Sequence, residues 1–186
     1  MNIRTVCFLI AVAIFLVVLA TISLKYYLRA RKSSQETWNR LLERLTFVDR
    51  DNIRLIALDI IDESGRPLTG EENFALQPAQ IWTLIGGLEG LEVLERNCKV
   101  LVDLAFHMQK WYPEALVVAE QLRLNAREIE WHVARLRGAA QTRNLESSFS
   151  AYAQSAIATY YLMTRSLLAL YQEGNLPGLT DLQRAL

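Results

Sequence analysis

The sequence predicts an all-α chain, with a single N-terminal transmembrane helix followed by an antiparallel three-helix (up-down) bundle with short accessory helices. An uncharged apolar run covers residues 5–24. Three later segments repeat apolar residues at alternating intervals of three and four, which is typical of helices that pack along one seam. Short links separate these segments, and short links favour antiparallel neighbours. We therefore expect a membrane anchor with its basic flank at 1–32, short helices and a loop at 33–77, and the helical bundle at 78–186.

The apolar run of residues 5–24 predicts a membrane-spanning helix. At about 1.5 Å per residue such a helix spans roughly 30 Å, the thickness of the hydrocarbon core of a bilayer. The run is longer than the apolar part of a signal peptide and lacks a convincing cleavage site. Arg4 alone precedes it, whereas the basic flank Lys25, Arg29, Arg31 and Lys32 follows it. This asymmetry predicts a single-pass protein of the cell inner membrane with a cytoplasmic C-terminal domain. The alternative is an uncleaved signal anchor with a periplasmic body.

The charges of the body argue against nucleic acid as a partner. Five of the 20 lysines and arginines precede Ser33, whereas none of the 20 aspartates and glutamates does. Residues 33–186 therefore carry 15 basic and 20 acidic side chains, a net charge of −5. A protein that binds nucleic acid needs a basic face to neutralise phosphates. The basic flank is instead expected to contact the headgroups of a lipid bilayer. Cys98 is the only cysteine of the body, which fits a reducing compartment.

Two short helices are expected between the anchor and the bundle. An amphipathic stretch runs from Glu36 to Leu45, and Asp49 or Asp51 can cap a second helix that ends near Ile61. Because isoleucine is frequent in this second segment, a β-strand is the alternative. Residues 62–77 contain two glycines and a proline and are expected to form a loop.

Three long helices are expected in the bundle. Pro78 begins the first and Pro113 breaks the chain after it. The second continues to Gly138, and the third runs from about Leu145 to Glu173. The apolar seams are expected at Leu91, Leu94, Cys98, Leu101, Ala105, Met108 and Tyr112, then at Ala119, Leu122, Ala126, Ile129, Val133 and Leu136, and finally at Phe149, Ala153, Ala156, Tyr160, Met163, Leu167 and Leu170.

Gly86, Gly87 and Gly90 lie inside the first long segment, where each glycine costs about 1 kcal/mol relative to alanine in a helix. We interpret them as a kink or as a close approach between helices. The alternative is that their backbone binds a ligand phosphate. No strand precedes them, as a nucleotide-binding loop would require.

Two pairs of histidine and carboxylate have the spacing of metal ligands on one helix. Asp103 precedes His107 by one helical turn, and Glu128 precedes His132 in the same way. Counted from the turn near residue 112, the two pairs differ in level by roughly 15 Å, which is too far for shared coordination. We expect no metal site and no catalytic residue. If the bundle holds a small molecule, the candidate pocket residues are Gly86, Gly87, Gly90, Asp103 and His107.

Two further groups of residues have structural interpretations. Glu89, Glu92 and Glu95 form a stripe that is expected to face solvent and to pair with Arg96 and Lys99 on the same helix. The four tryptophans are expected mostly to fill the core and its boundary; they are Trp38, Trp82, Trp111 and Trp131.

The tether, the long heptad helices and the lack of a catalytic motif favour a non-catalytic interaction or scaffold module at the cytoplasmic face of the membrane. Its expected partners are the lipid bilayer and another protein or a second copy of the chain, and no cofactor is expected. The alternative is a helical bundle that binds a small ligand or cofactor, as a sensor or a membrane-associated enzyme.

Overall fold

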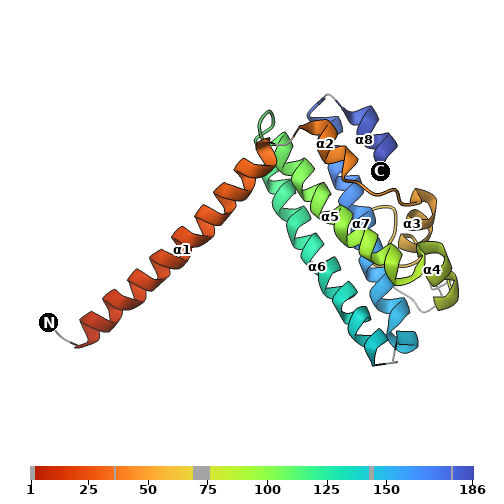
Figure 1. Ribbon diagram of the computed structural model, residues 1–186, viewed down its shortest axis with the longest axis horizontal. Coiled ribbons are helices and arrows are strands. Elements are labelled where there is room, and N and C mark those ends of the chain that lie inside the picture. The colour runs from red at the N-terminus through yellow and green to blue at the C-terminus, as the bar shows by residue number, and fades with distance from the viewer. Residues whose placement is uncertain (1–2, 36, 69–75, 143–144, 177) are drawn as a thin grey trace.

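The computed structural model describes the backbone of residues 3–35, 37–68, 76–142, 145–176 and 178–186. Within these ranges the chain forms eight helices and no strand, with one isolated antiparallel bridge between Ile61 and Pro67. The all-helical part of the prediction agrees with this. Figure 1 shows a body built on three long helices, with shorter helices around them and α1 (Ile3–Gln35) projecting away from the body.

The three long helices form the core. They are α5 (Gly87–Met108), α6 (Ala115–Gln141) and α7 (Leu145–Glu173), and they run in alternating directions side by side (Figure 1). Every residue of the three predicted seams is buried except Tyr112, which is half-buried. The heptad prediction is therefore confirmed at every seam position but Tyr112, and the burial of these apolar side chains is the main favourable contribution to folding.

A corner of glycines divides the first long segment into two helices. α4 (Pro78–Ile85) ends at Gly86, and α5 begins at Gly87. Gly86 and Gly87 have φ angles of 80° and 67°, in the left-handed region that favours glycine. A Cβ atom on Gly90 would lie 1.7 Å from the carbonyl oxygen of Ile85, so only glycine lets the two backbones approach this closely. The kink interpretation is confirmed.

Three short helices complete the body: α2 (Trp38–Glu43), α3 (Arg50–Ala57) and α8 (Leu179–Ala185). The Asp49 carboxylate accepts hydrogen bonds from the first backbone N–H groups of α3, so the strand alternative for this segment is wrong. The segment between α2 and α3 is held by buried Asn97, whose side chain bonds the N–H and the carbonyl of Thr46 at 2.9 and 2.7 Å.

The structure overturns the predicted transmembrane anchor. In the part of the chain that is described, no helix is long and apolar enough to cross a membrane. The single-pass topology, the inner-membrane localisation and the function as a membrane-anchored scaffold at the cytoplasmic face are corrected with it.

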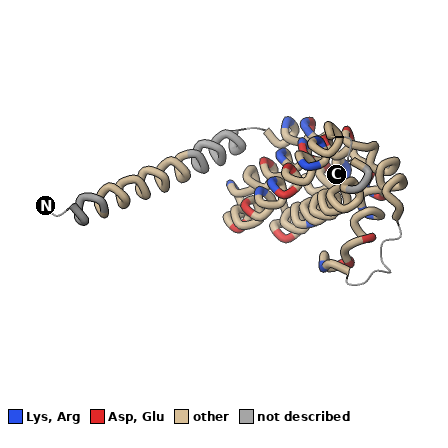
Figure 2. The backbone as a smooth tube through the Cα atoms, turned by 90° about the horizontal axis from the view of Figure 1, so that it is seen from below, with Lys and Arg blue, Asp and Glu red and all other residues tan. Residues whose placement is uncertain are grey.

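Among the described side chains, the charged ones lie on the body and α1 carries none (Figure 2). The described side chains of α1, from Phe8 to Leu24, are exposed. The predicted flank of Lys25, Arg29, Arg31 and Lys32 lies outside the side chains that the structure describes.

Candidate functional site

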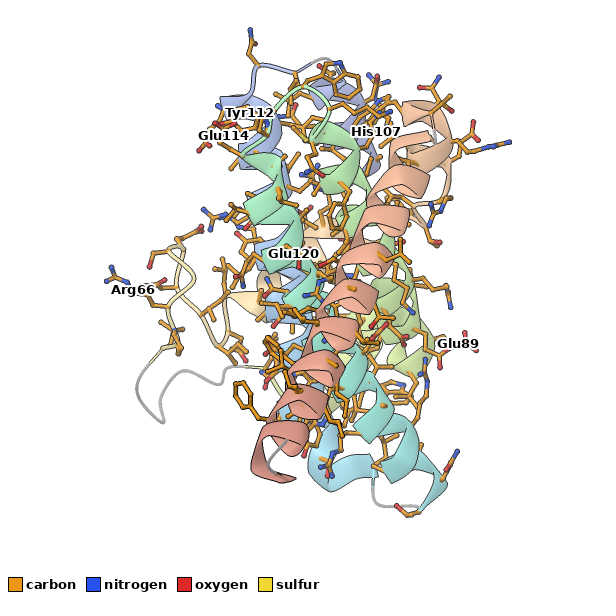
Figure 3. All side chains as sticks on the ribbon, turned by 90° about the vertical axis from the view of Figure 1, so that its left-hand side faces the viewer. Arg66, Glu89, His107, Tyr112, Glu114 and Glu120 are labelled. Carbon is orange, nitrogen blue, oxygen red and sulfur yellow. The ribbon has the colours of Figure 1, made fainter. Side chains whose placement is uncertain are left out.

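A cavity of about 320 Å³ lies at one end of the bundle, where α2 and α8 meet the C-terminal ends of α5 and α7. α1 joins the body at the same end (Figure 1). His107, labelled in Figure 3, marks this end of α5. The lining is mainly aromatic and consists of Trp38, His107, Trp111 and Tyr171 together with Met108, Leu176, Gly178 and Asp181.

The ends of helices bring these side chains together. Trp38 is the first residue of α2, and His107 lies in the last turn of α5. Pro113 has no N–H to donate and stops the chain from continuing as a helix, so Trp111 lies in the turn between α5 and α6. Tyr171 lies in the last turn of α7. The cavity is therefore a product of where the helices stop.

Gly178 closes one wall of the cavity against the Trp38 indole. It is the N-cap of α8 and has a φ of 92°, in the left-handed region. A Cβ atom at this position would lie 2.7 to 2.8 Å from three atoms of the indole. Glycine is thus required here for the backbone conformation and for the contact with the ring.

The four aromatic rings form one connected group. The ring centroids of Trp38 and Tyr171 are 5.1 Å apart, those of Trp38 and His107 6.5 Å, and those of His107 and Trp111 5.1 Å. These separations are typical of aromatic side chains in contact. Each ring therefore restricts the orientation of its neighbour, and the wall of the cavity is preformed.

Trp38 and Tyr171 offer a ligand their carbon surface and not their polar atoms. Tyr171 is 2% exposed, and its hydroxyl oxygen and the Trp38 Nε1 atom are both covered. Neither atom has a hydrogen-bond partner in the described part of the chain. Burial raises the pKa of Tyr171, so the hydroxyl stays neutral at physiological pH.

One acidic residue, Asp181, lies at the rim of the cavity, where it is exposed. Within the described lining no lysine or arginine opposes it. Lys110 is close to the site but outside its lining, and its Nζ atom lies 5.6 Å from the ring centroid of Trp111. The ring of Trp111 thus already binds one cation through its π-face.

The structure separates the predicted pocket residues into two groups. His107 lines the cavity, whereas Asp103, one turn earlier on α5, accepts a hydrogen bond from Arg44 at 3.0 Å and is outside the lining. Gly86, Gly87 and Gly90 form the corner at the opposite end of α5, about 30 Å away at 1.5 Å per residue.

The acidic stripe of α5 belongs to a ladder of ion pairs with α6. Arg137 donates to Glu92 at 2.9 Å and to Glu95 at 2.8 Å. Lys99 lies 3.3 Å from Glu95, as the spacing within the helix predicts, and also 3.1 Å from Glu130. Sequence reasoning missed the partners on α6. Exposed pairs of this kind contribute about 0.2–1 kcal/mol each, which indicates a structural role.

Sequence reasoning also missed most of the cavity lining. The sequence predicts that the tryptophans mostly fill the core and its boundary, yet Trp111 is 62% exposed. Trp82 and Trp131 are also exposed, at 41% and 49%. An aromatic residue two positions before a helix-breaking proline, as Trp111 is before Pro113, was the available signal.

Two other hollows are less suited to a ligand. The first, of about 400 Å³, is lined by arginines that already have partners within the protein. The Arg54 Nη2 atom lies 2.8 Å from the Glu63 Oε1 atom, and Arg50 donates a hydrogen bond to the Gln183 carbonyl at 2.6 Å. The second is a wide hollow beside Trp82 and Phe149, and it borders residues outside the described part of the chain. The aromatic cavity is therefore the best-defined candidate.

No model of a known protein family, no curated protein and no solved structure matches this chain. The function has to be inferred from the chemistry of the site itself.

Proposed function

We propose that this protein binds a small, mainly apolar molecule in the aromatic cavity. The observation that carries the proposal is a cavity of about 320 Å³. Its wall contains four aromatic rings, which come from α2, from the end of α5 and the turn after it, and from α7. Ligand pockets typically have volumes of about 300–1,000 Å³ and are lined mostly by apolar and aromatic groups. The volume is at the lower end of this range, which favours a ligand of small size.

The exposure of Trp111 supports the same conclusion. Tryptophan has a large apolar surface, and 62% of this side chain is exposed at the mouth of the cavity. An exposed ring beside an apolar hollow gains buried area when a ligand enters, at about 25 cal/mol per Å². The other wall residues are already fixed by their ring contacts, so little conformational entropy is lost on binding.

The test is a titration of the full-length chain with 3,3-dimethylbutan-1-ol, a compact neutral probe, followed by NMR chemical shifts. We expect saturable binding that Trp111→Ala weakens at least threefold, because the variant loses one wall of the cavity. Trp131→Ala is the matched control, since Trp131 is a similarly exposed tryptophan on α6 that does not line the cavity. Absence of binding to the native chain, or equal weakening by both variants, would contradict the proposal.

A further inference from the structure

We infer that the ligand of the aromatic cavity is an organic cation, of the quaternary or methylated ammonium class. This inference rests on the proposed function and adds the charge of the ligand to it. It follows from three features of the lining: the kind of surface that the rings present, the sign of the charge at the rim, and a cation already bound to one of the rings.

Two of the aromatic residues that line the cavity, Trp38 and Tyr171, present ring surface without an accessible hydrogen-bond donor. The Trp38 Nε1 atom and the Tyr171 hydroxyl are covered, so a ligand meets the rings of these residues and not their polar atoms. The π-face of such a ring carries partial negative charge and attracts a cation within about 6 Å of its centroid. A methylated ammonium suits this surface because its charge is spread over apolar methyl groups and needs no hydrogen bond.

The charge at the rim has the sign that a cation requires. Asp181 is the one acidic residue in the lining, and the described lining contains no lysine or arginine. A carboxylate ligand would meet repulsion from Asp181, and a neutral ligand would gain no Coulomb attraction from it. Since Asp181 is exposed, its contribution is screened by salt, whereas the contribution of the buried Tyr171 ring is screened much less.

The ring of Trp111 already contacts one cation of the chain, the ammonium group of Lys110. The Lys110 ammonium lies 5.6 Å from its centroid. A planar indole has two faces, and Lys110 does not line the cavity, so the cavity side of Trp111 remains for a ligand.

The experiment compares choline with 3,3-dimethylbutan-1-ol, which has the same shape but carries carbon in place of the charged nitrogen. Both are titrated into the full-length chain under the same buffer conditions. We expect choline to bind about tenfold more tightly, the gain that about 1.4 kcal/mol from cation–π contacts and the rim charge provides. Asp181→Asn should weaken choline about two- to fivefold and leave the alcohol unchanged. Glu89→Gln, which removes an exposed acid at the far end of α5 (Figure 3), should change neither.

The possible results separate the inference from the proposed function. If the alcohol binds as tightly as choline and competes for the same site, the cavity binds small molecules but the inference about charge is wrong. If neither probe binds, both the inference and the proposed function are wrong. Tighter binding of choline that Asp181→Asn and Glu89→Gln reduce equally would also overturn the inference, because it would show attraction to the acidic surface in general.

Discussion

Replacing Tyr171 by phenylalanine removes one oxygen atom from the wall of the aromatic cavity. The side chain is 2% exposed, and its hydroxyl has no hydrogen-bond partner in the described part of the chain. Leaving a buried polar group without a partner costs about 1–3 kcal/mol. Tyr171→Phe should therefore stabilise the ligand-free protein by about 1 kcal/mol or more, which corresponds to a rise of roughly 2–4 °C in Tm for a chain of this size. Thermal and urea unfolding of the full-length chain measure this change.

Tyr160 provides the matched control on the same helix. It is 4% exposed, but its hydroxyl accepts a hydrogen bond from the Asn97 side chain at 3.4 Å. Tyr160→Phe should therefore destabilise the protein by about 0.5–1.5 kcal/mol. The two variants make the same chemical change at equally buried positions and should have opposite signs. If Tyr171→Phe destabilises the protein as Tyr160→Phe does, its hydroxyl has a partner, such as a bound water, and our description of the cavity wall is wrong.

Two further predictions concern the glycine corner and His132. Gly90→Ala should destabilise the protein by more than about 2 kcal/mol, because the new Cβ would lie 1.7 Å from the carbonyl oxygen of Ile85. Gly138→Ala should instead stabilise the protein by up to about 1 kcal/mol, because a Cβ at that position meets nothing within 4 Å. Urea unfolding of both variants tests this pair, and equal effects would contradict the corner. Burial lowers the pKa of His132 below its ordinary value of 6.5, although Glu128 nearby opposes the shift. The unfolded chain therefore takes up this proton first, and the free energy of unfolding should fall as the pH drops below about 6.5. His132→Gln should reduce that slope between pH 7 and 5, and an unchanged slope would show that His132 does not cause it.

The bundle could be predicted because the spacing of apolar residues within each helix is visible in a short stretch of sequence. Residues such as Leu101, Ile129 and Met163 repeat at intervals that place them on one face of a helix, and all three are fully buried. The start of a helix at Pro78 and the break at Pro113 follow from the missing N–H of proline, which only the first turn of a helix tolerates. The glycine corner was also readable, since glycine is unfavourable within a helix and requires a reason.

The cavity could not be predicted because its lining comes from several separate segments, whose meeting depends on how the helices pack. Trp38, Trp111 and Tyr171 are far apart in the sequence, and they meet only because four helix ends lie at the same end of the bundle. The sequence pattern of a tryptophan does not distinguish a core position from a cavity wall. The partners of the acidic stripe were missed for the same reason, since Arg137 lies on a different helix. The anchor prediction depended on one apolar run, and no helix in the described part of the chain is long and apolar enough to cross a membrane.

The four tryptophans permit the most direct test of ligand binding in the cavity. Each contributes one indole N–H signal to the NMR spectrum of the ¹⁵N-labelled full-length chain, and only Trp38 and Trp111 line the cavity. On addition of 3,3-dimethylbutan-1-ol we expect the signals of Trp38 and Trp111 to shift with one common saturation curve, while those of Trp82 and Trp131 stay in place. If no indole signal shifts, or if all four shift together without saturation, the cavity is not a binding site and the proposed function is wrong.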